Sequence, residues 1–143
     1  MAIDRHASGL MILRLCIGVF LVFAGLSKYG WLTNSGPLAA QLGDWLKQAG
    51  PVNRWYLEQV AIPWTGVFAR LVMLGEFFCG LALILGFWTR TFAAVALLMV
   101  LNFHVASGAL FHARFLANGS GLPVVGALLA LAVGGSRLPL STR

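Results

Sequence analysis

The stretch "RLVMLGEFFCGLALILGFWTR", from Arg70 to Arg90, decides the fold because it has the length and composition of a membrane-spanning helix. A helix needs about 20 mainly apolar residues to cross a bilayer. Within this stretch, however, Glu76 interrupts the apolar run. A charged side chain near the centre of a spanning helix costs about 2.5 to 3.5 kcal/mol, so it faces a bundle interior or a hydrated cavity. Glu76 therefore marks a candidate functional site.

The composition of the whole chain agrees with a membrane protein. Of its 143 residues, 59% are hydrophobic and only 10% are charged, whereas about a quarter of an average soluble domain is charged. The net charge of +6 comes from basic residues scattered singly along the chain, which excludes the clustered footprint of a nucleic-acid-binding protein. We predict one membrane domain over residues 1–143, in contact with the lipid bilayer and not with nucleic acid.

Four stretches are long and apolar enough to be spanning helices, namely residues 9–27, 62–87, 91–111 and 116–136. The second and third are joined by a short turn, so they must be antiparallel neighbours. The sequence therefore predicts an all-α polytopic membrane protein with a four-transmembrane-helix bundle. Four spans place both termini on one side. With the charges of the long loop given less weight, the positive-inside rule favours cytoplasmic termini.

The long connection between the first and second spans has a helical pattern of its own. Apolar residues recur at helical spacing in "SGPLAAQLGDWLKQAGP", and Pro51 ends the pattern. Tryptophans in and beside this region prefer the headgroup level. We predict an amphipathic cap helix within residues 36–60, lying on the membrane surface or across the end of the bundle. A hydrated loop with scattered aromatic residues is the alternative.

Other polar side chains also fall within the predicted spans, and their depths suggest a partner for Glu76. With a rise of about 1.5 Å per residue, Arg14 lies about 7 Å and Glu76 about 16 Å from the terminal side. Arg70 is six residues from Glu76, about 120° around the helix, so these two do not stack. We therefore predict an Arg14–Glu76 ion pair. Either it only fixes helix register while Arg70 reaches its interface, or it lines a cavity that binds a polar head group or relays protons.

The third span contains Asn102 and His104, and the sequence places His104, Gly108 and His112 on one helix face. We favour a hydrogen-bonded bundle histidine at position 104, because no second histidine has the spacing of a bis-histidine cofactor site. Cys16 and Cys79 lie in apolar stretches without metal-ligand spacing. No metal or haem is expected.

Glycines form a second pattern within the spans. Gly18 and Gly25 lie one heptad apart on the first span, and Gly75, Gly80 and Gly86 recur along the second. Small residues allow helices to approach closely in lipid. We therefore assign these glycines to helix packing and not to chemistry.

Three motifs extend across the chain: "LRLCIGVFLVFAGLSKYG" near its start, "RLVMLGEFFCGLALILGFWTRTFAA" in its centre and "GSGLPVVGALLALAVGGSRLPLS" near its end. Together they resemble the DoxX family of small bacterial membrane proteins. The central G-E-x-x-x-G-L-x-L-x-L-G-x-x-T-R pattern is specific, because apolar composition alone would not produce its charges, glycines and spacing. The family pattern falls on Arg14, Lys28, Glu76, Arg90 and Arg137.

The resemblance implies a four-helix bundle in the bacterial inner (cytoplasmic) membrane, associated with redox proteins. One related group is similar to the small subunit of thiosulfate:quinone oxidoreductase. Other relatives accompany superoxide-detoxifying or sulfur-transfer partners. We therefore expect an inner-membrane subunit that binds a quinone-like or other hydrophobic ligand within the bundle and works with an electron-transfer partner, as part of a quinone-dependent oxidoreductase.

For this function we single out candidate residues that lie within or beside the predicted spans. The candidate catalytic residues are Glu76, Arg14 and Arg70, and the candidate ligand-binding residues are Lys28, Arg90, Asn102, His104 and Trp64. Glu76 would exchange a proton while an arginine holds a carbonyl oxygen or keeps Glu76 ionised. A quinone is the expected cofactor, and a redox protein and further copies of the chain in a homo-oligomer are the expected partners.

Two other classes of function stay open. The chain could be a non-catalytic membrane scaffold or anchor for partner proteins, in which the ion pair serves assembly only. It could also be a small transporter, although the broken-helix repeats common in carriers are missing from its spans.

Overall fold

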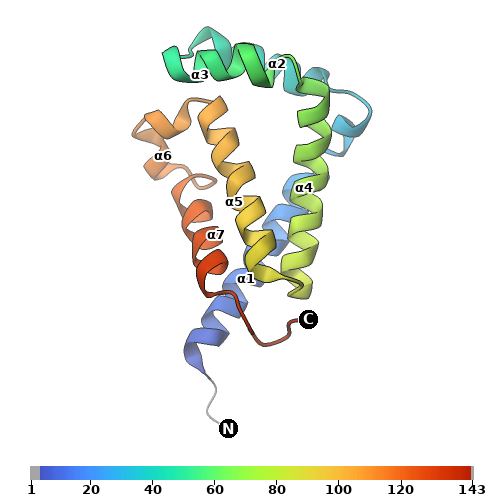
Figure 1. The fold of residues 1–143 in the computed structure, drawn as a ribbon, viewed down its shortest axis with the longest axis vertical. Coiled ribbons are helices and arrows are strands. Elements are labelled where there is room, and N and C mark those ends of the chain that lie inside the picture. Colours follow the sequence, from blue (N-terminus) through green and yellow to red (C-terminus); the bar gives the residue numbers. More distant parts are fainter. Residues whose placement is uncertain (1–3, 143) are drawn as a thin grey trace.

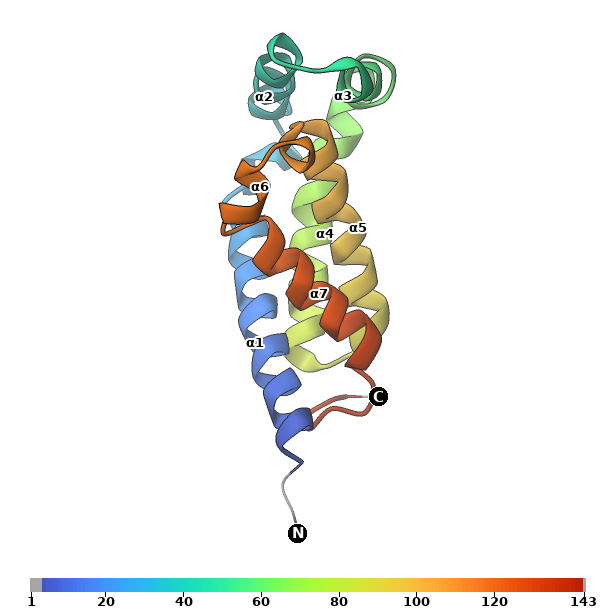
Figure 2. The same cartoon turned by 90° about the vertical axis from the view of Figure 1, so that its left-hand side faces the viewer.

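The computed structural model describes residues 4–142, which form helices and turns only. Three long apolar helices run along the long axis of the molecule: α1 (Arg5–Leu26), α4 (Thr65–Leu85) and α5 (Thr89–Ala106) (Figure 1). Each is long and apolar enough to cross a membrane. A shorter helix, α7 (Leu122–Gly134), packs against α5 and α1 (Figure 2). The all-helical prediction and three of its four long apolar helices are thus confirmed.

The predicted fourth span differs most from the structure. In place of one helix over residues 116–136, the chain has α6 (Arg114–Ala117), a turn and then α7. Asn118 and the following glycines form this turn, and Pro123 lies in the first turn of α7. At 13 residues, α7 rises only about 20 Å, which is less than the hydrocarbon thickness of a bilayer. The apolar run in the sequence therefore overstated the length of this helix.

The ends of the second and third spans also differ from the prediction. α4 ends at Gly86, whose φ of 70° lies in the left-handed region that favours glycine. α5 ends at Ala106, because Gly108 has a φ of 71° and leads into the 3₁₀ turn η3 (Ala109–Phe111). The predicted face of His104, Gly108 and His112 therefore does not continue along one helix.

α1 and α4 pack closely because glycines face each other across their contact. A Cβ atom added at Gly80 would lie 2.6 Å from the backbone nitrogen of Val22 and 2.7 Å from the carbonyl oxygen of Gly18. A Cβ atom at Gly25 would lie 2.8 Å from the backbone nitrogen of Phe77. Real Cβ atoms do not approach so closely, so only glycine fits at these contacts. They hold α1 and α4 in one register, as expected for small residues between membrane helices.

The connection between α1 and α4 lies across one end of the bundle (Figure 1). It consists of a 3₁₀ turn η1 (Tyr29–Leu32), α2 (Gly36–Lys47), α3 (Pro51–Tyr56) and a π-helical turn η2 (Leu57–Ala61). Gly50 and Pro51 separate α2 from α3, so the interval 36–60, in which one cap helix with an end at Pro51 was predicted, also holds a second helix. The apolar side of this layer forms a small core with the ends of α4 and α5, made by Leu38, Leu42, Leu57, Ala61, Ala69 and Ala106.

The opposite end of the bundle, here called the terminal end, comprises the start of α1, the turn at Gly86–Trp88 and the C-terminal segment 135–142 (Figure 1). The C-terminal segment folds back beside the end of α4, where the backbone nitrogen of Thr142 donates to the carbonyl oxygen of Leu85 at 3.2 Å. The chain therefore runs along the bundle in alternating directions in α1, α4, α5 and α7, and returns to the end where it began.

Candidate functional site

Glu76 forms an ion pair with Lys28. The Lys28 Nζ atom donates to the Glu76 Oε2 atom at 2.7 Å and to the carbonyl oxygen of Ala24 at 2.9 Å. The side chains of Lys28 and Glu76 are 22% and 17% exposed, respectively. The predicted Arg14–Glu76 pair is therefore wrong, and the cation beside Glu76 is the lysine that follows α1.

The register of α1 against α4 explains this partner. Gly25 lies against the backbone of Met73 and Phe77, which brings the last turn of α1 beside Glu76. The flexible four-carbon stem of Lys28 then folds back along that turn, as long basic side chains do near helix ends. The predicted partner was sought among residues inside the predicted spans, and Lys28 lies one residue beyond the span 9–27, so its reach back to Glu76 was missed.

The ion pair lines a cavity of about 300 Å³ between α1, α4, α5 and α7, here called the Glu76 cavity. Its polar lining includes Lys28, Glu76 and His104, and most of its other walls are apolar. The remaining lining residues are Phe20, Leu21, Ala24, Ser27, Val72, Met99, Val100, Phe103, Ser120 and Val124. A hydrophobic pocket with a few convergent polar groups is the usual form of a small-molecule site.

His104 is buried and fixed in the wall of this cavity. Its Nε2 atom lies 3.0 Å from the carbonyl oxygen of Ser120, and its ring packs edge-on against Phe115 with the centroids 5.1 Å apart. A carbonyl oxygen only accepts hydrogen bonds, so Nε2 carries the hydrogen. This agrees with a hydrogen-bonded bundle histidine, and it also places a second titratable side chain beside the Lys28–Glu76 pair.

A model of the DoxX family matches residues 9–113. The chain belongs to the DoxX family. The matched part holds Lys28, Glu76 and His104, whereas α7 and the C-terminal segment follow it. No curated protein and no solved structure gives a significant match to the chain.

In this DoxX-family protein, Arg14 lies at the terminal end, away from the Glu76 cavity. It is fully buried, and its Nη1 atom donates to the Ser141 Oγ atom at 2.6 Å. Its Nη2 atom donates to the carbonyl oxygens of Leu140 at 3.1 Å and Pro139 at 3.3 Å. Arg14 therefore holds the C-terminal segment against α1. Gly86 lies against its guanidinium, where a Cβ atom would clash.

The other predicted site residues of the DoxX-family chain also lie outside the lining of the Glu76 cavity. Arg70 donates to the carbonyl oxygens of Gly66 at 2.7 Å and Leu32 at 3.1 Å, which fits a side chain directed to its interface. The Arg90 Nε atom donates to the carbonyl oxygen of Ala132 at 3.0 Å. Trp64 is exposed just before α4.

Asn102 ties α5 to the layer across the bundle end. Its Oδ1 atom accepts a hydrogen bond from the Tyr56 hydroxyl. Burial raises the pKa of the Tyr56 phenol above its ordinary value. Tyr56 therefore stays a protonated donor at neutral pH, and this contact is structural.

The structure thus brings together three of the predicted site residues of the DoxX-family chain: Lys28, Glu76 and His104. Sequence reasoning missed the apolar walls and Ser120. Val100 shares a helix face with His104 at a spacing of four residues, so this part of the wall could have been identified. Ser120 lies in a turn between α6 and α7 and carries no such signal. Within residues 4–142, no group of three or more His, Cys, Asp or Glu side chains could hold a metal ion.

Proposed function

We propose that this DoxX-family protein is a redox-associated membrane subunit that binds the ring of a quinone-like molecule in the Glu76 cavity. The observation that carries this proposal is the placing of one acid, one lysine and one histidine in a single cavity whose other walls are mainly apolar. Intramembrane ionisable groups are functional by default. The family relationship supports a membrane subunit, and the ligand class is inferred from the cavity.

The residues of the cavity fit such a ligand. Its volume of about 300 Å³ is at the lower end of the range of small-molecule pockets, about 300 to 1,000 Å³. It can therefore hold a ring but not a long isoprenoid tail. Phe20 and Phe103 supply aromatic walls for the ring, and Met99 supplies an adaptable one. Phe20 is also partly exposed, so the tail can leave beside it into the lipid.

When bound, a quinone would supply two-electron, two-proton redox chemistry. The Lys28 ammonium group can donate a hydrogen bond to a ring oxygen while it remains beside Glu76. Glu76 can give or take a proton, because a carboxyl group in a partly desolvated site changes its protonation state readily. His104 offers a second proton-exchanging group from α5. These side chains carry no electrons, so the electrons must come from a partner redox protein.

A binding titration tests this proposal. The full chain, purified in nanodiscs, is titrated with a short-chain ubiquinone analogue by calorimetry. We expect saturable binding that Glu76→Gln weakens about tenfold or more, since a lost hydrogen bond to a charged group corresponds to about 1.5 to 3 kcal/mol. Glu58→Gln is the matched control, because Glu58 forms an exposed pair with Arg54 outside the cavity. Absence of saturable binding to the unaltered chain would refute the proposal.

Exposed aromatic side chains at the α2–α3 end favour one alternative, a non-catalytic anchor for partner proteins. Tyr29, Trp55 and Trp64 are all exposed there. If the ion pair serves assembly only, the double exchange Lys28→Glu and Glu76→Lys should restore whatever function either single change removes. If the cavity binds a quinone ring, the exchange should restore folding but not quinone binding, because the positions of donor and acceptor are reversed.

We further propose a fourth membrane crossing, formed by α6, the following turn and α7, with both ends of the chain on the cytoplasmic side of a bacterial inner membrane. The return of the C-terminal segment to the terminal end supports this topology. Single cysteines at Ser35 and Ser141, in a Cys16→Ala/Cys79→Ala background, should differ in labelling of intact cells by an impermeant maleimide, with only position 35 reacting. The expected homo-oligomer stays a prediction, which native mass spectrometry can test.

A further inference from the structure

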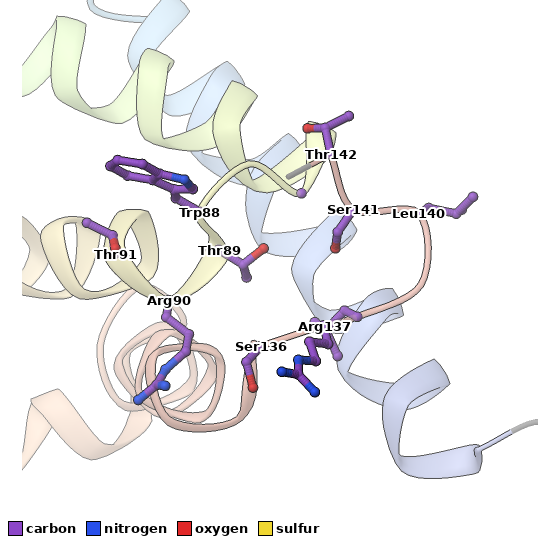
Figure 3. A pocket seen from close by; sticks show the side chains of 12 residues that line it. Trp88, Thr89, Arg90, Thr91, Ser136, Arg137, Leu140, Ser141 and Thr142 are labelled. Carbon is purple, nitrogen blue, oxygen red and sulfur yellow. The ribbon is translucent and has the colours of Figure 1, made fainter.

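A second and larger pocket, of about 760 Å³, lies at the terminal end. Its walls come from the turn between α4 and α5 and from the C-terminal segment (Figure 3). It is separate from the Glu76 cavity and shares no lining residue with it. Nothing in the proposed quinone chemistry requires it.

The charge of this pocket is positive. Arg90 and Arg137 line it and extend on the same side, with Ser136 between them (Figure 3). Arg14 lies directly behind its wall, bonded to Ser141. Among residues 4–142, the lining contains no acidic side chain. Asp4, the acid nearest in sequence to α1, instead caps that helix by accepting from the backbone nitrogen of His6 at 3.0 Å.

The first turn of α5 opens into the same pocket. Thr89, Arg90 and Thr91 all line it. Trp88, the residue that precedes this helix, provides no side-chain cap. Within residues 4–142, the backbone N–H groups of these first three positions have no side-chain or loop acceptor. Free N–H groups at the start of a long helix, with the positive end of the helix dipole, favour an anion.

An independent observation points to a ligand. Thr89 is only 4% exposed, and its Oγ1 atom has no hydrogen-bond partner among the described residues. In Figure 3 this hydroxyl points toward the C-terminal segment, inside the ring of lining residues. Buried hydroxyl groups are nearly always hydrogen-bonded, so one without a partner calls for an unseen acceptor or donor. An oxyanion would be a suitable acceptor.

From these features we infer that the terminal-end pocket binds a phosphate group. The guanidinium groups of Arg90 and Arg137 suit phosphate oxygens because their planar donors match them in pairs. The start of α5 and the Thr89 hydroxyl supply further donors. The group can come from an anionic phospholipid or from a soluble phosphate. Trp88 and Leu140, whose exposed apolar side chains line the same pocket, suit the glycerol and upper acyl carbons of a lipid.

Lipid titration by native mass spectrometry tests the inference on the full chain in detergent. The probes are dioleoylphosphatidylglycerol, its phosphate-free counterpart dioleoylglycerol, and inorganic phosphate. We expect one phosphatidylglycerol molecule to bind at least tenfold more tightly than dioleoylglycerol. Arg137→Gln should weaken this binding about tenfold, and Arg137→Lys should weaken it less. The control Arg54→Gln, an exposed arginine at the opposite end, should leave the affinity unchanged.

Thr89→Val gives a readout that does not depend on the arginines. Without phosphate, this change removes a buried hydroxyl that lacks a partner, so the melting temperature should rise or stay the same. With phosphatidylglycerol, the variant should gain less in melting temperature than the unaltered chain. A melting temperature that is unchanged or raised without phosphate also shows that the variant is folded.

The outcomes separate the two sources of phosphate and the failure of the inference. Stabilisation by inorganic phosphate, with no preference of phosphatidylglycerol over dioleoylglycerol, would assign the site to a soluble phosphate compound. The inference is wrong if neither phosphatidylglycerol nor inorganic phosphate binds. It is also wrong if Arg54→Gln weakens binding as much as Arg137→Gln does, because the attraction is then unspecific. None of these results bears on quinone binding in the Glu76 cavity.

Discussion

Lys28 and Arg14 are both basic residues associated with α1, but the bundle accommodates their charges in different ways. Lys28 meets the carboxylate of Glu76 at 2.7 Å. Arg14 is fully buried and meets only a hydroxyl and two carbonyl oxygens of the C-terminal segment. The Glu76 cavity is therefore nearly neutral as a unit, whereas the described residues of the terminal end carry a net positive charge. A neutral pair suits proton exchange with an uncharged ring, and an uncompensated positive end suits an anion.

Replacement of Lys28 should cause the largest loss of stability. Lys28→Met leaves the Glu76 carboxylate in the cavity without its cation. Loss of one partner of a buried pair costs about 3 to 5 kcal/mol, and because both side chains keep some exposure we expect about 2 to 3 kcal/mol by the same rule. Unfolding in sodium dodecyl sulfate measures it. The double variant Lys28→Met/Glu76→Gln should recover most of the lost stability. If it is as unstable as Lys28→Met alone, the unpaired Glu76 carboxylate is not the cause of the loss.

A methyl group added at the α1–α4 contact should have the next largest effect, and it should act on the Glu76 cavity. Gly80→Ala places a Cβ atom 2.6 Å from the backbone of Val22, and overpacking of this kind costs about 1 to 3 kcal/mol. It should weaken quinone binding by shifting Lys28 from Glu76. Gly126→Ala is the control, because a Cβ atom there meets nothing within 4 Å. Equal effects of the two changes would show that the helix contact is not tight.

The matching removal of Arg14 should have a smaller effect than the removal of Lys28. Arg14→Met deletes hydrogen bonds from a charged group, worth about 1.5 to 3 kcal/mol in general, but it leaves no carboxylate without a cation. We expect a loss of about 1.5 kcal/mol by this rule. Trypsin should also cut after Arg137 faster, because the C-terminal segment is released. Unchanged cleavage would mean that other contacts hold the segment.

The smallest effect concerns the neutral contact between Tyr56 and Asn102 at the α2–α3 end. Because burial raises the pKa of Tyr56 in the folded chain, the unfolded chain loses this proton first as the pH rises. The protonated Tyr56 phenol therefore stabilises the folded chain fully at pH values below its unfolded pKa of about 10. This stabilisation is lost as the pH rises through the pKa of Tyr56 in the folded chain. The stability difference between the unaltered chain and Tyr56→Phe should shrink from pH 9 to pH 11. A constant difference would contradict burial of the phenol.

Much of the fold was predictable because its signals are local. The length and hydropathy of the runs around α1, α4 and α5 predicted long apolar helices, and the glycines predicted close packing. The fourth span was predicted too long, because its apolar run was counted from residue 116 although Gly119 and Gly121 are turn-forming residues that precede α7. In the layer over residues 36–60 the sequence predicted one helix that ends at Pro51, but not the second helix, α3, that begins there.

The candidate site was predictable only in part. The sequence by itself determined that Glu76 and His104 lie in apolar helices and need partners, because the cost of placing polar groups in lipid follows from residue type. Which groups become those partners was decided by the tertiary structure. The glycine contacts set the register of α1 against α4 and bring Lys28 to Glu76, while the fold-back of the C-terminal segment gives Arg14 its acceptors. Such pairings depend on side-chain reach and on residues far apart in the chain, which no local pattern records.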